Sequence, residues 1–255
     1  MFDLFSFLDP ITLGAALGIA VLAGTIKGMV GFAMPMILIS GLGTFLSPEV
    51  ALAGLILPTV VTNGMQALEQ GWRAARDSIL RFSTFLIIGL VCLLASAQTL
   101  RFLPRDLLFL MIGGPITLFA LLQLVGWQLR LRGPSRRAEA IIGGIAGAIG
   151  GVSGIWGPPT VAYLTAINTE KSEQMRVQGV IYGLGAVALV FAHLGSGILT
   201  AQTATFSAVL IVPAVAGMWI GARIRGGIDQ VAFRRATLIV LFVAGLNLIR
   251  RGLGF

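Results

Sequence analysis

A glycine- and proline-rich stretch near the N-terminus recurs in the second half of the chain. The first copy covers residues 23–35 and the second covers residues 146–158, an offset of 123 residues without a gap. Three glycines and a proline coincide: Gly24 with Gly147, Gly28 with Gly151, Gly31 with Gly154, and Pro35 with Pro158. A recurrence of this kind is typical of an internal duplication, so we expect two related halves.

The composition places this duplicated chain in a membrane. Hydrophobic residues make up 56% of the sequence and charged residues only 11%, against about 25% charged in a soluble domain. Eight apolar stretches cover residues 11–44, 50–68, 79–99, 106–127, 139–168, 177–200, 204–222 and 232–249. About 20 apolar residues cross a bilayer core. The sequence therefore predicts an all-α polytopic membrane protein whose surroundings are the lipid bilayer.

A basic, turn-rich joint at residues 129–138 divides the chain into halves of similar pattern. We predict a single membrane domain over residues 1–255, built from repeats at 10–128 and 139–252. Each repeat opens with a long apolar segment and continues with three ordinary spans. The basic residues lie in short links between spans, and no basic face interleaved with aromatic residues is visible, which argues against nucleic-acid binding.

The first segment of each repeat is too long for one upright helix. Residues 11–44 would extend about 51 Å as a continuous helix, whereas the bilayer core is about 30 Å thick. Glycine weakens a helix and proline removes an amide donor, and both residue types cluster inside each long segment. We therefore expect two half-helices joined at a break in each repeat.

The distribution of basic residues indicates how the chain passes each break. If each long segment crossed the membrane once, nine basic residues would lie on one face and eight on the other. If each segment turned back as a hairpin, thirteen would share one face and four the other, with Lys27 inside the membrane. Cytoplasmic loops carry the excess of Lys and Arg. The hairpin is therefore preferred over the single crossing, and it makes the two halves inverted copies.

The breaks are candidate ligand sites. Non-helical backbone at membrane depth persists only where protein or a wet cavity satisfies its polar groups. One interpretation is that the glycines allow close helix crossings. The other is that the N-termini of the half-helices offer free N–H groups and a partial positive charge to an anion. The second is favoured because the break occurs at matching places in both halves.

Lys27 is the only basic residue well inside an apolar stretch. It either balances the charge of an anionic substrate or snorkels and caps the end of a half-helix. The sequence leaves both roles open, since Gly150 stands at the equivalent place in the second half.

The candidate substrate-binding residues lie at the two breaks and in the span that follows each. They are Lys27, Gly28, Gly31, Phe32, Asn63, Gln66, Gly151, Ser153, Gly154, Trp156, Arg176, Gln178 and Tyr182. Asn63 and Gln66 are three residues apart, so one helix face carries both. We expect no catalytic residue, metal site or cofactor, because the chain has one histidine, one cysteine and no carboxylate deep in a span.

The duplicated pattern Gly24-x3-Gly28-x2-Gly31-x3-Pro35 resembles the sulfite exporter TauE/SafE family of membrane anion transporters, also called TSUP. The eight apolar segments in two halves extend the resemblance over nearly the whole chain. It implies a secondary transporter of small sulfur-containing or organic anions, such as sulfite, sulfonates or sulfoacetate, in a bacterial inner membrane. The chain departs from the family at Phe32-Ala33 and Ile155-Trp156, which stand where a further glycine is usual and give the site a bulkier wall.

Other functions remain open at the level of sequence. A passive anion channel would use the same anion-favouring breaks, and a partner subunit without transport of its own is also compatible with the chain. An intramembrane enzyme is disfavoured by the scarcity of catalytic side chains. Neither a coupling proton nor homo-oligomerisation is decided by these residues.

Overall fold

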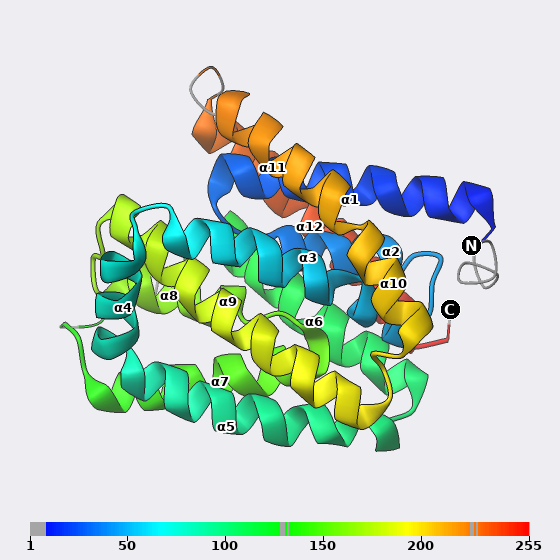
Figure 1. Cartoon of the computed structure of the whole chain (residues 1–255), viewed down its shortest axis with the longest axis horizontal. Coiled ribbons are helices and arrows are strands. Elements are labelled where there is room, and N and C mark those ends of the chain that lie inside the picture. Colours follow the sequence, from blue (N-terminus) through cyan, green and yellow to red (C-terminus); the bar gives the residue numbers. More distant parts are fainter. Residues whose placement is uncertain (1–8, 128–130, 132, 225–226, 228, 255) are drawn as a thin grey trace.

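The computed structural model describes residues 9–127, 131, 133–224, 227 and 229–254, which are helical and contain no strand (Figure 1). The first half consists of α1 (Pro10–Val30), α2 (Met34–Leu42), α3 (Pro48–Leu68), α4 (Trp72–Arg81), α5 (Ser83–Thr99), the 3-10 turn η2 (Leu100–Phe102) and α6 (Arg105–Leu124). The second half consists of α7 (Arg136–Ser153), α8 (Gly157–Ala166), α9 (Lys171–Ser196), α10 (Ala201–Val209), α11 (Ile211–Ile224) and α12 (Gln230–Gly252).

Several helices are long and apolar enough to cross a membrane. Five candidates occur in the described chain: α1, α3, α6, most of α9, and α10 with α11 taken together. The pair α4 and α5 passes the same test but is bent by 77° between the two helices. The prediction of an all-α polytopic membrane protein is confirmed.

Local sequence signals set where the spans begin. The Asp9 carboxylate accepts hydrogen bonds from the backbone N–H groups of Ile11 and Thr12 at the start of α1. The Ser47 side chain caps α3 in the same way through Val50. In both helices a proline follows the cap directly, where its missing N–H costs nothing.

The first break turns the chain back on itself. Gly31 ends α1 in the left-handed conformation, with φ of 83°, and its N–H donates to the Lys27 carbonyl at 2.7 Å. After the break, α2 runs back along α1, so that a Cβ added to Gly41 would lie 2.8 Å from Ile19. The first long segment is therefore a hairpin.

The second break has the same form. Gly154, with φ of 70°, ends α7 and donates its N–H to the Gly150 carbonyl. Tyr163, in α8, donates a hydrogen bond of 3.2 Å to Glu139 near the start of α7. Both long segments are hairpins, as the charge distribution predicts, and the single crossing is wrong.

The prediction of two half-helices per hairpin is only half correct. α2 and α8 are short, with 9 and 10 residues, but α1 has 21 residues and α7 has 18. The glycines inside α1 and α7 do not interrupt those helices, because they pack against a neighbouring helix. An added Cβ at Gly24 would lie 2.0 Å from the Ala214 carbonyl oxygen in α11, and one at Gly147 would lie 2.0 Å from the Gly89 oxygen in α5.

The two halves are inverted and interlocked. α3 and α9, which are equivalent in the two repeats, cross antiparallel at the centre of the bundle, with Gly183 beside Asn63 and Gly179 beside Ala67. α1 packs along α11, and α7 packs along α5, so each hairpin rests on a helix of the other half (Figure 1). The exact repeat boundaries at 10–128 and 139–252 stay a prediction.

The bundle separates the basic residues onto two faces. α7, α9 and α12 begin on the face of the bundle where α3 and α11 end. This basic face carries the described arginines Arg73, Arg76, Arg81, Arg136, Arg137, Arg176, Arg223 and Arg235. α1 begins and α12 ends on the opposite face (Figure 1). Arg130, Arg132 and Arg225, which belong to the same sequence-based count, lie outside the described residues, as does part of the predicted joint at 129–138.

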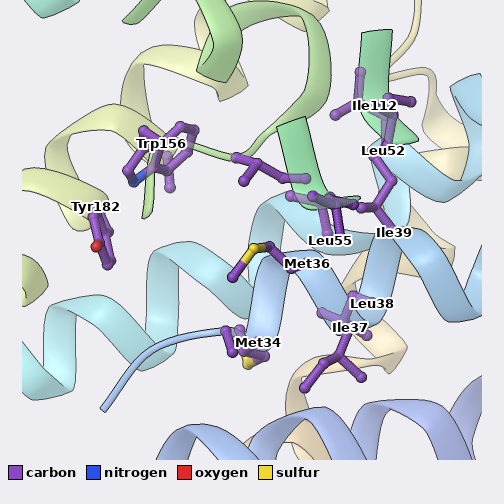
Figure 2. Packing of buried hydrophobic residues seen from close by; sticks show 14 of the residues in the cluster. Met34, Met36, Ile37, Leu38, Ile39, Leu52, Leu55, Ile112, Trp156 and Tyr182 are labelled. Atoms are coloured by element: carbon purple, nitrogen blue, oxygen red, sulfur yellow. The ribbon is translucent and has the colours of Figure 1, made fainter. Parts of the chain in front are cut away.

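The core lies where the short helix α2 is enclosed by α1, α3 and α12. Met34, Met36 and the three residues after Met36 are almost fully buried, and Figure 2 shows them against Leu52, Leu55 and Ile112. A helix that is apolar on all sides is stable only when it is surrounded. α2 is thereby fixed at the centre, and its N-terminus lies beside the middle of α3.

A proline inside α3 is compensated by the other half. Pro58 has no N–H, so the Gly54 carbonyl loses its helical donor. The Ser207 hydroxyl, in α10, donates to that carbonyl at 3.1 Å and accepts a hydrogen bond from the Leu57 N–H. In a membrane such freed groups must be satisfied by protein, and this contact also links the halves.

Candidate functional site

Lys27 is buried in the middle of the protein. It lies on the last turn of α1, and only 2% of its surface is exposed. Its ammonium group donates a hydrogen bond of 3.2 Å to the Thr62 hydroxyl and another to Asn63 Oδ1, both on α3. The side chain therefore turns inward to α3 and does not snorkel to the membrane surface.

Lys27 has no acidic partner among the residues that the structure describes. The ion pairs formed by the described residues are Arg81 with Glu173, Arg105 with Glu49, and Arg176 with Glu173, and none includes Lys27. A charged ammonium in a membrane core is costly unless an opposite charge or several dipoles surround it. Because Thr62 and Asn63 are neutral, they leave the positive charge of Lys27 uncompensated, so an anionic ligand could pair with it.

The residues next to Lys27 carry unused hydrogen-bonding atoms. Asn63 accepts from Lys27 through Oδ1, but its buried amide nitrogen has no partner. Gln66 has no partner for its buried Oε1. A buried polar atom without a partner costs about 1–3 kcal/mol. The unused N–H donors of Asn63 lie on the same side chain that contacts the ammonium, which suits an acceptor ligand such as an anion.

A cavity of about 230 Å³ leads away from Lys27. Its lining residues come from α1, α3, α9 and α11 and from Glu69 after the end of α3: Lys27, Gly28, Gly31, Met65, Gln66, Glu69, Met175, Met218 and Ala222. Since α3 ends and α9 begins on the basic face, the cavity runs from the membrane interior toward that face. Lys27 thus lies at the inner end of a passage.

Gln66 ties the first break to the other half. Its amide nitrogen donates to the Gly31 carbonyl at 3.0 Å and to the Met175 carbonyl in α9 at 2.8 Å. This bridge joins the end of α1, the end of α3 and the start of α9. Any movement of the first hairpin relative to α9 has to break it.

The N-terminus of α2 has more unbonded backbone N–H groups than the N-terminus of α8. Met34 and Met36 occupy its first and third positions, and the backbone N–H groups there have no partner within the helix. In α8 the second and third positions are Pro158 and Pro159, which have no N–H. The first hairpin therefore offers more backbone donors than the second.

The second break is apolar and bonded to itself. Ser153 donates to the Ile149 carbonyl at 2.7 Å and accepts a hydrogen bond from the Ile155 N–H. Trp156 is buried beside Tyr182, with ring centroids 6.3 Å apart, and Figure 2 shows the two rings together. The Tyr182 hydroxyl donates to the Gly157 carbonyl at 3.3 Å. This region forms a wall and offers no charged group.

Comparison with known proteins assigns the chain to a family. The family model described as "Sulfite exporter TauE/SafE" matches residues 16–248. The chain belongs to the TauE/SafE family. Searches of curated proteins and of solved structures each returned no match. The TauE/SafE family consists of membrane transporters for sulfite-type anions, and the multi-pass helical bundle with a buried lysine agrees with that class.

The structure brings together only part of the site expected for this TauE/SafE member. Lys27, Gly28, Gly31 and Gln66 line the cavity, and Asn63 contacts Lys27. Gly28 also packs on α11, where an added Cβ would lie 2.1 Å from the Met218 oxygen. Gly28 therefore allows the close crossing of α1 and α11, as the packing interpretation predicts, and it also lines the cavity; its role in ligand binding stays a prediction.

Other predicted residues lie apart from the cavity. Gly151 packs against α5, with an added Cβ 2.3 Å from the Leu93 oxygen, and Gly154 contacts Leu52 and Leu55 of α3. Phe32 faces Phe119 edge-on at 6.3 Å. Gln178 is buried in α9. None of these side chains lines the Lys27 cavity.

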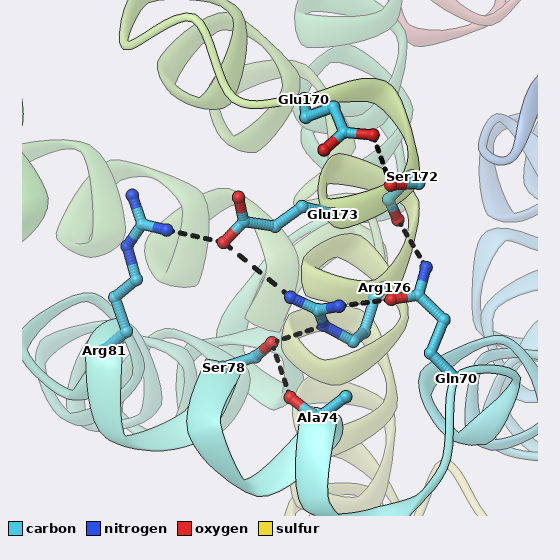
Figure 3. A network of polar contacts seen from close by, with 8 residues as sticks. All are labelled: Gln70, Ala74, Ser78, Arg81, Glu170, Ser172, Glu173 and Arg176. Atoms are coloured by element: carbon cyan, nitrogen blue, oxygen red, sulfur yellow. Dashed lines mark hydrogen bonds and ion pairs between the residues drawn. The ribbon is translucent and has the colours of Figure 1, made fainter.

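Arg176 belongs to a network at the basic face. Figure 3 shows its guanidinium between Gln70, Ser78 and Glu173, with the Ser78 hydroxyl at 3.0 Å and Glu173 at 3.7 Å. Because its guanidinium is bound by Ser78, Gln70 and Glu173, the last shared with Arg81, Arg176 anchors α4 to α9 at the membrane surface.

The structure adds residues that the sequence did not single out as ligands. Thr62 binds the Lys27 ammonium and precedes Asn63 directly. Met175 and Met218 complete the cavity from the second half. A hydroxyl beside an intramembrane asparagine was a usable signal for Thr62. No sequence signal pointed to the methionines, because their place depends on how the halves pack.

Proposed function

We propose that this chain is a secondary transporter, or permease, for small organic or sulfur-containing anions such as sulfite, sulfonates or sulfoacetate. The supporting observation is the buried Lys27 ammonium, whose hydrogen-bond partners in the described part of the chain are neutral and which lies beside the unused amide donors of Asn63. The localisation that fits this proposal is the bacterial inner, or plasma, membrane.

The substrate completes the charge balance of the site. Glu69 also lines the cavity, but it is exposed and forms no ion pair with Lys27. An anion next to Lys27 therefore supplies the countercharge in contact with the ammonium. Asn63 contributes N–H donors, and the N-terminus of α2 contributes backbone N–H groups and a partial positive charge. The same arrangement allows a proton on Lys27 to accompany the anion, so a coupling proton belongs to the proposal.

Transport requires the site to open to each face in turn. The cavity in this structure extends from Lys27 toward the basic face, whereas the buried core around α2 closes the side toward the opposite face. Inverted repeats provide the complementary state when their roles are exchanged. Movement of α1 and α11 relative to α3 and α9, with rupture of the Gln66 bridge, is the proposed opening step.

A thermal-shift series on purified protein tests the site. Sulfite, sulfoacetate, taurine and a small carboxylate are titrated, because a ligand that binds the folded state stabilises it by about 2.7 kcal/mol at 100 times its Kd. We expect saturable stabilisation by at least one sulfur oxyanion, and its loss in Lys27→Met. Arg250→Met, on the opposite face, is the matched control and should retain it. Equal stabilisation of wild type and Lys27→Met would contradict the proposal.

A passive anion channel uses the same residues and is the alternative. Single-channel currents in planar bilayers distinguish the two, since a carrier that rearranges its hairpins for every ion gives no resolvable unitary current. Resolved unitary currents carried by sulfite would replace the carrier proposal with the channel.

A further inference from the structure

An apolar groove lies between α5, α7 and α9, with no lining residue in common with the Lys27 cavity. Its volume is about 490 Å³, and Ser83 is the one hydroxyl-bearing residue among those that line it. Trp156, from the second break, is part of the lining. The groove therefore reaches from the outer surface of the bundle to the wall of the candidate transport path.

The groove opens to the surrounding lipid. Its rim includes Ile87, Val187 and Phe191, which are 62%, 41% and 68% exposed. Exposed apolar side chains on membrane-spanning helices face acyl chains. Along α5 the groove extends from Ser83 to Leu93, ten residues or about 15 Å. That is half of a core about 30 Å thick, or one leaflet.

A surface helix stands at the mouth of the groove. α4 is bent by 77° from α5, so it lies along the membrane surface. It buries Ala75 and Ser78 and exposes Arg73 and Arg76. Ile79, one turn after Arg76 on the same face, lines the groove. The apolar groove and the basic surface of α4 are therefore continuous.

The start of α7 brings a second arginine to the same mouth. α7 runs parallel to α5, with Gly143 against Phe85. Arg136 lies two turns before Gly143 on the same face of α7, which places it level with the end of α4. Both Arg136 and Arg76 are exposed and, within the described chain, neither forms an ion pair, whereas Arg81 is paired with Glu173.

We infer that this groove binds one acyl chain of an anionic phospholipid from the leaflet at the basic face, with the headgroup phosphate between Arg76 and Arg136. The apolar lining selects a hydrocarbon chain, and the two arginines select a negative headgroup over a zwitterionic one. Asp77 is the exposed acidic residue of α4, and it leaves that helix with a positive net charge. The end of the acyl chain contacts Trp156, so the bound lipid reaches the second break.

Quenching of Trp156 fluorescence tests the inference directly. Trp156 is kept as the sole tryptophan, and the others are replaced in Trp72→Phe, Trp127→Phe and Trp219→Phe. The protein is reconstituted with phosphatidylglycerol or phosphatidylcholine carrying brominated acyl chains, which quench only at contact. We expect phosphatidylglycerol to bind about five-fold more tightly for each arginine involved. Equal quenching by the two lipids overturns the inference.

Paired variants test the acyl-chain groove and the headgroup arginines separately. Arg76→Gln with Arg136→Gln should remove the preference for phosphatidylglycerol, while Arg250→Gln on the opposite face keeps it. Val187→Phe fills the rim and should reduce quenching by both lipids, and Val243→Phe, exposed on α12, should not. If the double arginine variant retains the full preference, the headgroup assignment is wrong.

Native mass spectrometry of the wild-type protein provides a second readout that needs no variant to fold. Phosphatidylglycerol adducts should survive at collision energies that release phosphatidylcholine. Glycerol 3-phosphate, which has the phosphate but no chain, should not be retained. Retention of glycerol 3-phosphate, or equal retention of the two lipids, would contradict a site that requires both chain and charge.

Discussion

Asn63 determines the chemical character of the residues around Lys27. It is fully buried, accepts from the ammonium and leaves its own N–H donors unused. A neutral amide keeps the positive charge of Lys27 available to a ligand, whereas a carboxylate at this position would neutralise it. The difference between these two isosteric side chains gives a sharp test of the anion site.

Asn63→Asp should abolish anion transport while the protein still folds. The new carboxylate pairs with Lys27 and repels an incoming anion, and like charges in contact cost several kcal/mol. We expect at least a ten-fold lower sulfite flux in proteoliposomes, with thermal stability equal to or above wild type. Asn247→Asp, beside Arg250 and outside the site, is the control and should transport normally. Unchanged flux in Asn63→Asp would show that the anion does not pass Lys27.

Ser207 illustrates a residue whose importance is structural. Its hydroxyl satisfies the carbonyl of Gly54 that Pro58 leaves without a donor. Ser207→Ala should lower the free energy of unfolding by about 1–3 kcal/mol, the usual cost of an unsatisfied buried group. Thermal denaturation in detergent measures it, and Thr205→Ala, whose hydroxyl bonds only within α10, should change stability by less. Equal effects would indicate that the Gly54 carbonyl finds another partner.

At the scale of elements, the halves interlock mainly through α1 with α11, α5 with α7, α6 with α12, and α3 with α9. The pairs α1 with α11 and α5 with α7 carry the repeated glycines. Both pairs approach so closely that glycine is required on each side. The repeated glycines therefore have two separate tasks. Gly24 and Gly147 allow backbone contact, while Gly31 and Gly154, with positive φ, end the helices.

Gly24→Leu and Gly147→Leu should each destabilise the fold strongly. The added side chain meets a backbone carbonyl oxygen at 2.0 Å in both cases. Backbone cannot yield as a side chain can, so we expect a loss of about 3 kcal/mol, the upper end of the usual cost of overpacking. Gly18→Leu in α1 and Gly114→Leu in α6 meet nothing within 4 Å and are the controls. Monodispersity and thermal midpoint in detergent report the outcome. Similar behaviour of all four variants would contradict the glycine-mediated packing.

The elements also show what the sequence predicts well and what it does not. Hydropathy and charge distribution predict the spans and both hairpins, because lipid solvation and topology act on composition. They do not predict that α1 continues through Gly24 and Gly28, since a glycine at a tight crossing looks the same as a glycine at a break. The surface helix α4 is also absent from a hydropathy reading, because half of its residues are polar.

At the scale of the whole molecule, the candidate site is assembled from both halves. Lys27, Asn63 and Gln66 could be grouped from sequence, because one is an intramembrane charge and the other two share a helix face. Met175 and Met218 could not, and Arg176 could not be assigned to the surface network, since these positions depend on how α9 and α11 pack against the first half. The duplication signals that two halves exist but not which surfaces they exchange.

The most direct measurement of the central claim is radiolabelled sulfite flux into proteoliposomes containing wild type, Lys27→Met or the control Arg250→Met. If Lys27 supplies the countercharge to the passing anion, its loss should reduce the flux at least ten-fold, whereas Arg250→Met should match wild type. A Lys27→Met protein that is correctly folded and transports sulfite at the wild-type rate would contradict the account.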